Sequence, residues 1–397
     1  MNKIYLLLPS YKKTSPIQGA FMDADILLEK FNVNLIFING KSSEFKTRKN
    51  INYFFLEDIS SKFFSKYIYL KNIFQNTNEK HVVISYCLIA DIYLFLISNF
   101  IYSISYIRGN LRTNYKYSFG TIYGFILYLY HKSILKFNHH NFSLSKNHSS
   151  ILKKNGIENI PIENHLNENV LKEIKIKEPI TKKIKHYLYV GSISDLKQTN
   201  LLIDLSQELI KKKFHFIFHV YGEGSKRSSF LSLVKDNQLK KYIKVYSYNN
   251  ISNIYKRHYD LFVSTSMSEG VSRSIMEALF FNVPVIARNV DGNVDLIDDG
   301  LNGFKYSKNS ELADIFIKSI NYKFNTKKLL KNEFTYAIAK KKKLKIISDI
   351  LMSKNIYLNH KNKNYFIKLI IFFFTLLLLF TLDLRKLKIF SSISINK

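Results

Sequence analysis

Cysteine is nearly absent from this chain of 397 residues, because Cys87 is the single one. One cysteine excludes a disulfide within the chain and is typical of proteins from a reducing compartment. The sequence also has no cluster of cysteine and histidine with the spacing of metal ligands, and we interpret His139-His140 as a surface pair. We therefore expect no bound metal.

Acidic residues are scarce, with 30 Asp and Glu against 60 Lys and Arg, which gives a formal net charge of +30. Such an excess raises the hypothesis of a nucleic-acid binder. However, lysine is spread along the chain, and no helix-turn-helix, zinc finger or aromatic RNA-binding motif is present. The charge favours anionic lipid head groups or acceptors that carry pyrophosphate as partners.

No apolar run is long enough to be an unambiguous membrane span. The first, which begins at Ile4, is too short for the core of a signal peptide, so we expect a cytoplasmic amino terminus. The uncharged apolar run near the carboxyl end, Leu369 to Leu382, falls short of the roughly 20 residues that a spanning helix needs. Because lysine and arginine flank it, we expect residues 361–390 to form a membrane-associating tail, as a peripheral attachment or an anchor.

Between residues 185 and 306, apolar strand-like runs alternate with amphipathic stretches. Strands are predicted at 185–192, 214–221, 243–246, 260–266 and 283–287, with helices between them. This alternation predicts an α/β domain with a doubly wound parallel sheet. Ligands of such sheets bind beyond the carboxyl ends of the strands, where Gly191, Gly222 and Glu269 fall.

One segment, residues 269–279, carries two carboxylates eight positions apart, Glu269 and Glu277. On a continuous helix they would lie about 12 Å apart along the axis. The first-turn N–H groups of Gly270 to Ser274 would be available to an anion between them. A nucleotide-diphosphate-sugar has this shape, with sugar hydroxyls, a pyrophosphate and ribose hydroxyls in series. Two solvated glutamates on an amphipathic helix are the alternative reading of this spacing alone.

Several spaced motifs in this region resemble the donor-binding half of a GT-B fold, retaining glycosyltransferase of family 4. The resemblance implies two Rossmann-like, doubly wound domains that face a cleft: residues 1–175 on the acceptor side and residues 185–351 on the donor side. It implies no metal and no cofactor, since the nucleotide-sugar is a substrate. The matching pieces are Val190-Gly191, Lys197, Gly222-Glu-Gly224, Tyr255, Asp260 to Val263, Ser266, Glu269-Gly270, Glu277-Ala278, Pro284 to Ile286 and Asp299 to Gly303.

The same resemblance assigns roles to individual residues. Glu269 would contact hydroxyls of the donor sugar, Glu277 the ribose and Lys197 the diphosphate. We predict Glu269 and Lys197 as the catalytic residues. The predicted donor-binding residues are Gly191, Ser192, Gly222, Gly224, Gly270, Val271, Ser272, Arg273 and Glu277.

Two departures from the family pattern bear on activity. Ser192 stands where the family usually has an arginine that faces the diphosphate, and Arg273, Lys226 and Arg227 are candidate replacements for its charge. The family's cleft histidine is missing near Arg108, which we predict, together with Gly19, on the acceptor side. A guanidinium there could bind an acceptor phosphate in a bidentate manner; an ordinary surface role is the alternative.

The sequence thus predicts a hexosyl- or N-acetylhexosaminyl-transferase on the cytoplasmic face of a membrane. It would move a sugar from a nucleotide-sugar, with UDP favoured, to a lipid-linked saccharide during assembly of a surface polysaccharide. Three alternatives stay open: a sugar-nucleotide epimerase of the same architecture, a donor-binding scaffold without catalysis, and, last, a nucleic-acid binder. The donor sugar, the acceptor and the linkage are not encoded in any motif that we can read.

Overall fold

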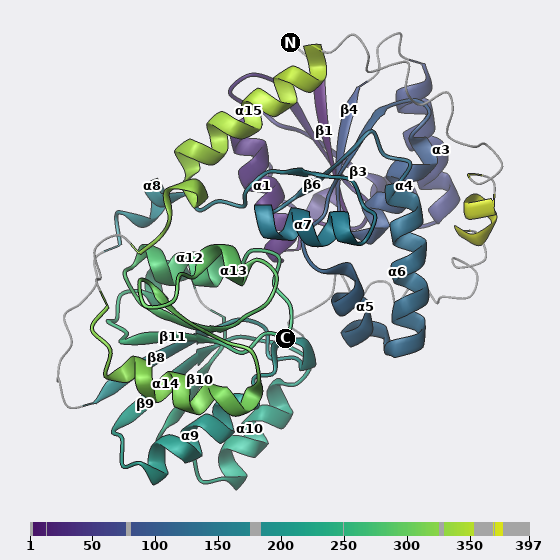
Figure 1. Ribbon diagram of the computed structural model, residues 1–397. Coiled ribbons are helices and arrows are strands. Elements are labelled where there is room, and N and C mark those ends of the chain that lie inside the picture. The colour runs from purple at the N-terminus through teal and green to yellow at the C-terminus, as the bar shows by residue number, and fades with distance from the viewer. Residues whose placement is uncertain are drawn as a thin grey trace. The chain divides into compact units, whose positions relative to one another are not determined.

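The computed structural model describes residues 3–12, 14–76, 81–174, 184–248, 250–324, 329–352, 368 and 370–375. The chain divides into two compact units (Figure 1). The first unit comprises Met1–Arg108, Phe119–Ile162 and Ala339–Ser392, and the second comprises Gly109–Ser118, Glu163–Ile338 and Ile393–Lys397.

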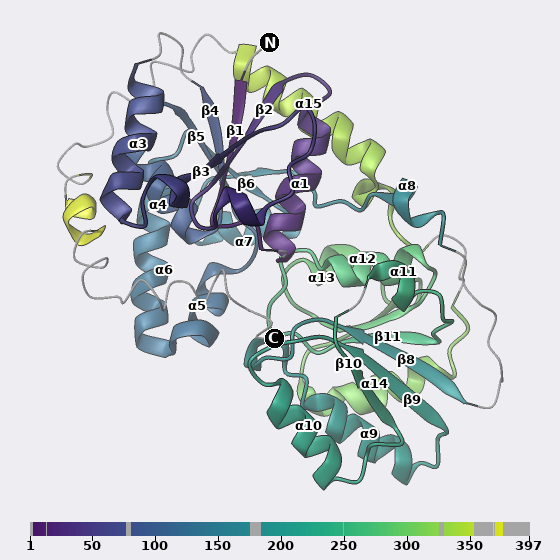
Figure 2. The ribbon, with the colours of Figure 1, turned by 180° about the vertical axis from the view of Figure 1, so that it is seen from behind.

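The first unit is built on a parallel sheet of seven strands in the order β3-β2-β1-β4-β5-β6-β7. The apolar runs near residues 3, 33, 81 and 104 form strands β1, β2, β4 and β5. Central strand β1 is buried from Ile4 onward because helices cover both faces of the sheet (Figure 2). The strands are β1 (Lys3–Leu8), β2 (Asn32–Phe37), β3 (Asn52–Phe55), β4 (Val82–Tyr86), β5 (Tyr102–Tyr106), β6 (His140–Ser143) and β7 (Ile160–Pro161).

Helix α1 (Ser15–Leu27) has Pro16 in its first turn, where a missing backbone N–H leaves no helical hydrogen bond unmade. Helix α15 (Tyr336–Met352) enters the first unit from the distant carboxyl-terminal part of the chain. The other helices here are α2 (Leu56–Ile59), α3 (Phe63–Gln75), α4 (Leu88–Ile97), α6 (Thr121–Leu135) and α7 (Lys146–Lys154).

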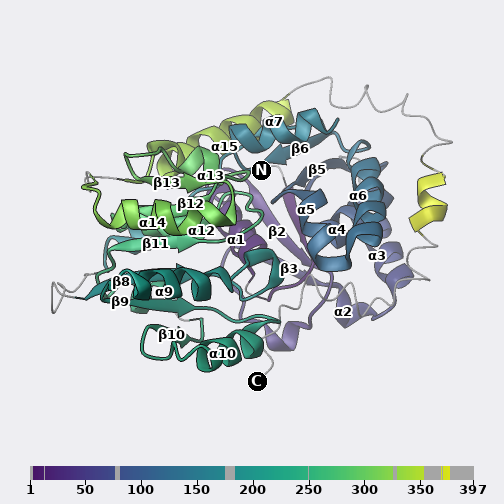
Figure 3. The ribbon, with the colours of Figure 1, turned by 60° about the horizontal axis from the view of Figure 1, so that its bottom comes forward.

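The second unit holds a parallel sheet of six strands in the order β10-β9-β8-β11-β12-β13, which confirms the predicted doubly wound topology (Figure 3). The chain order reverses between β8 and β11, so the loops after these two strands diverge at the edge where ligands of such sheets bind. The strands are β8 (Lys185–Val190), β9 (Phe216–Tyr221), β10 (Ile243–Tyr246), β11 (Leu261–Ser264), β12 (Val285–Arg288) and β13 (Gly303–Tyr306).

The amphipathic helices of this unit bury their apolar faces against the sheet. In α9 (Leu201–Lys211), Leu202, Leu205 and Leu209 enter the core beside Phe218 of β9. The remaining helices are α5 (Leu111–Phe119), α8 (Glu168–Leu171), α10 (Arg227–Asp236), α11 (Ile251–Ile254), α12 (Arg273–Phe280), α13 (Asn293–Leu296) and α14 (Leu312–Ile320).

Two expectations need comment. Helix α12 begins at Arg273, so Glu269 lies in the preceding loop, and the 12 Å rise calculated for a continuous helix was wrong. Most of the predicted tail, residues 361–390, lies outside the described residues. Within the described part of the chain, no helix combines the length and the apolar character needed to cross a membrane.

Candidate functional site: a lysine–glutamate pair at the sheet edge

The two predicted catalytic residues meet at the carboxyl edge of the second sheet. Lys197 ends a single 3₁₀ turn (Asp195–Lys197) after β8, and Glu269 lies in the loop after β11. The Lys197 Nζ atom is 2.5 Å from Glu269 Oε1, and the two side chains are 21% and 16% exposed. A close ion pair that water still reaches is able to exchange partners, because its desolvation is incomplete.

Backbone contacts hold the two loops together independently of the ion pair. The Thr265 hydroxyl donates to the Lys197 carbonyl oxygen at 2.6 Å, and the Met267 N–H donates to the Leu196 carbonyl oxygen at 2.9 Å. The loops after β8 and β11 are therefore fixed to each other beside the point where the chain order reverses.

Glycines allow the backbone turns after β8 and β9 to come into close contact at the same edge of the sheet. A Cβ atom on Gly222 would lie 2.0 Å from the Gly191 carbonyl oxygen, and one on Gly224 would lie 2.3 Å from the Ile193 carbonyl oxygen. Gly224 also has a φ of +154°. These positions require glycine because no side chain fits between the turns after β8 and β9.

Among the residues that the structure describes, the partners of Ser192 are all local. The Tyr189 hydroxyl donates to the Ser192 carbonyl oxygen at 3.0 Å, and the Ser192 and Ser194 hydroxyl oxygens are 3.3 Å apart. A short neutral side chain with these contacts does not supply the positive charge of the arginine that the family pattern has here.

The loop that carries Glu269 is braced from the far side by residues that no motif identified. The Ser268 hydroxyl donates to Asp291 Oδ2 at 2.9 Å, and the Asn110 side-chain amide donates to Asp291 Oδ1 at 3.1 Å. The Gly292 N–H donates to the Glu269 carbonyl oxygen at 3.2 Å. A Cβ on Gly292 would lie 1.5 Å from the Gly270 carbonyl oxygen, so this contact also requires glycine.

Gly270, Val271 and Ser272 form the end of this loop rather than the first helical turn. The Asn164 side-chain amide donates to the Val271 carbonyl oxygen at 3.1 Å. Ser272 is the amino-terminal cap of α12, and its carbonyl oxygen accepts from the Met276 N–H at 3.1 Å. The amino-terminal donors of the helix therefore begin at Arg273, the first residue of α12, and not at Gly270.

Glu277 lies within α12, beside an aromatic wall. Desolvation by burial raises the pKa of its carboxyl to about 7, while the Arg273 guanidinium acts in the opposite direction. The buried Tyr255 hydroxyl has no hydrogen-bond partner among the described residues, and its ring stacks on Phe281 at 4.3 Å between centroids. Burial, and secondarily Glu277, raises the Tyr255 pKa well above its usual value. A raised carboxyl pKa and an unsatisfied hydroxyl leave hydrogen-bonding capacity for a polar ligand.

Two of the candidate replacements for the missing arginine already have acidic partners. Arg227 Nε is 3.3 Å from Glu223 Oε2, and Lys226 Nζ is 3.3 Å from Asp195 Oδ2. Arg273 is half-buried at the start of α12, where its charge acts on Glu277. Of these three, Arg273 is the one that lies within the predicted donor-binding segment.

With this geometry in hand, comparison with known proteins is informative. The family model described as glycosyl transferases group 1 matches residues 171–339, which span the whole second sheet and its loops. Residues 171–339 are thus similar to the glycosyl transferases group 1 family, and the match covers less than half of the chain.

Two curated relatives are similar to part of this chain. The UDP-N-acetylglucosamine–peptide N-acetylglucosaminyltransferase GtfA subunit of Streptococcus agalactiae is 29% identical over 176 residues, which cover 43% of this chain and 35% of the relative. The poly(ribitol-phosphate) alpha-N-acetylglucosaminyltransferase of Staphylococcus aureus is 30% identical over 138 residues, which cover 33% of this chain and 28% of the relative. The chain thus spans about a third of the length of the curated relatives that it matches.

Solved structures extend the likeness of fold to both units. HepE of Anabaena, solved in complex with UDP-glucose, superimposes with a TM-score of 0.68 at 15% identity, over 88% of this chain and all of that one. At this identity the comparison establishes the fold alone, which is the GT-B architecture of two parallel-sheet units.

The two predicted acceptor-side residues lie together in the first unit. A Cβ on Gly19 would lie 2.2 Å from Arg108 Nη2, so the guanidinium covers the glycine directly. Arg108 Nη1 is 3.9 Å from Asp23 Oδ2, and its side chain is 6% exposed. The guanidinium also lies over the Tyr106 ring at 5.1 Å. A buried arginine with these neighbours stabilises the sheet edge, and its role as a phosphate ligand stays a prediction.

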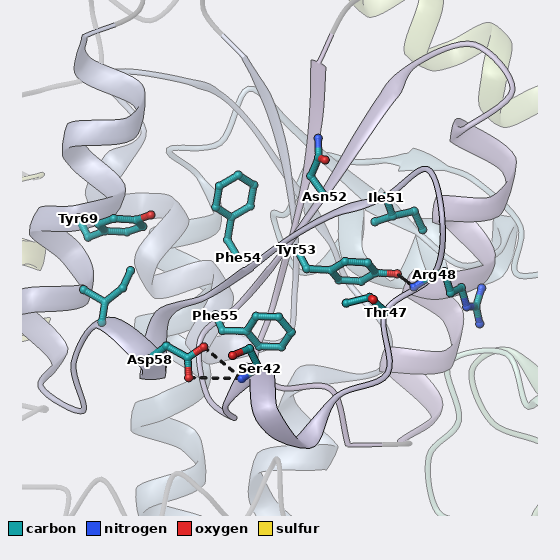
Figure 4. A pocket seen from close by; sticks show the side chains of 11 residues that line it. Ser42, Thr47, Arg48, Ile51, Asn52, Tyr53, Phe54, Phe55, Asp58 and Tyr69 are labelled. Atoms are coloured by element: carbon teal, nitrogen blue, oxygen red, sulfur yellow. Dashed lines mark hydrogen bonds between the residues drawn. The ribbon is translucent and has the colours of Figure 1, made fainter.

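The first unit also has an open hollow beside edge strand β3 (Figure 4). None of the predicted site residues lines it. Its polar groups already bond one another in part, since Asp58 accepts from the Ser42 N–H at 3.1 Å and the Tyr53 hydroxyl accepts from the Arg48 N–H at 3.2 Å. The lining residues are Ser42, Thr47, Arg48, Ile51, Asn52, Tyr53, Phe54, Phe55, Asp58, Ile59 and Tyr69.

Proposed function

We propose that the chain is a retaining glycosyltransferase that moves a sugar from a nucleotide-sugar, with UDP as the nucleotide, to a lipid-linked saccharide in surface-polysaccharide assembly. The observation that carries the proposal is the Lys197–Glu269 pair at the carboxyl edge of β8 and β11. The match of residues 171–339 to the glycosyl transferases group 1 family supports sugar transfer. The names of the two relatives support UDP-N-acetylglucosamine as a donor class and a polymer as an acceptor class.

In this proposal the pair separates when the donor binds. The Lys197 ammonium would donate to diphosphate oxygens, and the Glu269 carboxylate would accept from hydroxyls of the sugar. The bond between the anomeric carbon and the diphosphate oxygen then breaks while a bond to the acceptor oxygen forms on the same face. The acceptor proton passes to the departing diphosphate. The chain's residues contribute by positioning the reactants and by stabilising the charge that develops on the leaving group.

We also propose how the charge of the diphosphate is balanced and where in the cell the protein works. The site would work with neither a metal nor a cofactor, and charge on the diphosphate would be met by Lys197 and Arg273. Within the described residues, no group of three or more His, Cys, Asp or Glu side chains could hold a metal ion. The protein would work at the cytoplasmic face of a membrane, attached through residues 361–390, because the apolar run there is flanked by basic residues.

The test is a donor screen on the purified chain in mild detergent. UDP- and GDP-sugars are offered with a membrane-lipid extract, and both free nucleotide and labelled sugar in the lipid phase are measured. Label in the lipid phase supports the transferase. Conversion of a UDP-sugar without any acceptor would favour the epimerase instead, and tight donor binding without turnover would favour the scaffold.

Substitution of Lys197 tests its role in the same screen. Lys197→Met should lower kcat by about 100- to 1,000-fold, since it removes a preorganised charge at the leaving group. Lys226→Met is the matched control, because that lysine is exposed and pairs with Asp195 instead. Equal losses in the two variants would contradict the role of Lys197.

A further inference from the structure

Helix α6 presents an apolar face to solvent in the first unit. Ile122 and Tyr123 are 73% and 70% exposed, and Phe125, Ile126 and Leu129 are each exposed by 40% or more. These residues lie three and four positions apart, so they form one stripe along the helix. We call these five residues the α6 stripe.

The opposite face of α6 is buried and largely apolar, apart from His131, whose Nε2 atom lies 2.9 Å from Asp91 Oδ2. Leu127, Ile134 and Leu135 are buried, and the helix contacts α4 (Figures 1 and 3). When both faces of a helix carry apolar residues, both faces are usually covered by other protein or by lipid. Helix α9 shows the usual arrangement, since its fully exposed positions are Asp204, Gln207 and Lys211.

A second exposed apolar segment lies against the same helix. The Thr375 and Tyr130 hydroxyl oxygens are 2.8 Å apart, and the Phe374 and Tyr130 ring centroids are 6.0 Å apart. Of this segment, Phe373 is 60% exposed and Ile370 is 53% exposed. The sequence continues beyond Thr375 with Leu-Leu-Leu-Leu-Phe. Apolar surface on α6 is therefore continuous with the start of the uncharged run.

Charge around the stripe has one sign. No aspartate or glutamate occurs between Asp91 and Glu158, a stretch that contains the whole of α6. Lys132 lies near the end of the helix, and Lys136 follows it with an exposed side chain. An apolar and aromatic stripe flanked only by cations complements a bilayer with anionic head groups, in which rings enter the interface and lysines meet phosphates.

We propose that the α6 stripe, together with the exposed side chains of residues 370–374, docks on an anionic lipid bilayer. This inference deepens the proposed function, since it names the surface by which the first unit would reach a lipid-linked acceptor. It differs from attachment through the tail alone, because the stripe belongs to the folded acceptor-side unit. Docking through α6 fixes how that unit faces the lipid, whereas a tail alone would leave it tethered.

The test is flotation of the full-length chain with vesicles of phosphatidylglycerol and phosphatidylcholine, and with phosphatidylcholine alone. The triple variant Ile122→Ser/Phe125→Ser/Leu129→Ser should lower the partition coefficient about tenfold or more, because interfacial binding scales with the apolar area inserted. The matched control Leu231→Ser/Ile338→Ser, at exposed apolar sites on α10 and α15, should bind as the unchanged chain does.

Further variants and measurements distinguish docking of the α6 stripe on lipid from attachment through the tail and from contact between two copies of the chain. Leu377→Asp/Phe380→Asp in the full-length chain introduces charge into the uncharged run and should leave measurable, α6-dependent binding. Unchanged flotation of the triple variant would overturn the proposal, as would complete loss of binding in the tail variant. A loss of dimer mass by light scattering in the triple variant, with flotation unchanged, would assign the stripe to contact between two copies.

Two controls keep this result separate from the donor site. UDP-glucose affinity of the triple variant, measured by calorimetry, reports on the second unit and should be unchanged. Far-ultraviolet circular dichroism and thermal unfolding verify that serine at these exposed positions leaves the fold intact. Vesicle binding with no donor binding would refute the proposed function alone, and the reverse would refute only the docking surface.

Discussion

The raised pKa of Glu277 leads to a prediction about donor binding and pH. If Glu277 accepts hydrogen bonds from the ribose hydroxyls, its carboxyl must be ionised when the donor binds. With a pKa of about 7, about a tenth of the free protein is ionised at pH 6 and about nine-tenths at pH 8. The affinity for UDP-glucose should therefore be about tenfold lower at pH 6 than at pH 8.

Isothermal titration calorimetry measures this directly. UDP-glucose is the right ligand because its diphosphate stays fully ionised over this range. Below pH 7, binding should also release nearly one proton, which appears as an enthalpy that changes with the ionisation enthalpy of the buffer. Glu277→Gln is the matched control, since it keeps the size and shape of the side chain and cannot titrate.

Three results would contradict the reasoning. Equal affinity at both pH values would show that the ionisation of Glu277 does not govern binding. An unchanged pH dependence in Glu277→Gln would show that another group titrates. If Glu277→Gln binds UDP-glucose as tightly as the unchanged chain at pH 8, the assignment of this residue to the ribose is wrong.

Three further outcomes follow from the same structure. The folded state binds the Glu277 proton more tightly than the unfolded chain does. The contribution of this carboxyl to stability is therefore full below the unfolded pKa of 4.5 and is lost as pH rises through about 7. Glu277→Gln should then raise the free energy of unfolding at pH 8 by up to about 3 kcal/mol, as measured by urea titration. Gly222→Ala places a Cβ 2.0 Å from a carbonyl oxygen and should cost about 1–3 kcal/mol by the same measurement, more than Gly120→Ala, where the φ is +80° but no atom lies within 4 Å. Burial raises the pKa of the Cys87 thiol to about 12, so iodoacetamide should modify the native protein at pH 7.5 at least about 100-fold more slowly than the protein in urea; comparable rates would contradict its burial.

The sequence predicted the parallel sheets well because their signal is local. Apolar runs such as Lys3–Leu8 and Ile243–Tyr246 became strands with these bounds. The pairing of Lys197 with Glu269 was also within reach, since both residues follow strands whose ends share one sheet edge.

The start of α12 was not within reach, because it depends on distant contacts. The helical periodicity near Ile275 gives no sign that Gly270 and Val271 are held in a loop by Gly292 and Asn164. The same holds for Asp291, whose partner Asn110 is separated from it by 181 positions. The dipeptide Asp291-Gly292 is a turn signal, but it does not indicate that the turn supports the loop that carries Glu269.

The contribution of α15 to the first unit has a consequence for how the protein is made. Lys343 on this helix forms an ion pair with Asp23 of α1, with both side chains buried, and Ile347 is buried as well. During synthesis, the ribosome releases residues 1–162 long before this helix. The main part of the second unit, Glu163–Ile338, is contiguous and can therefore complete its fold first. A nascent chain stalled before residue 339 would expose the seat of α15 and so be a target for chaperones and proteases.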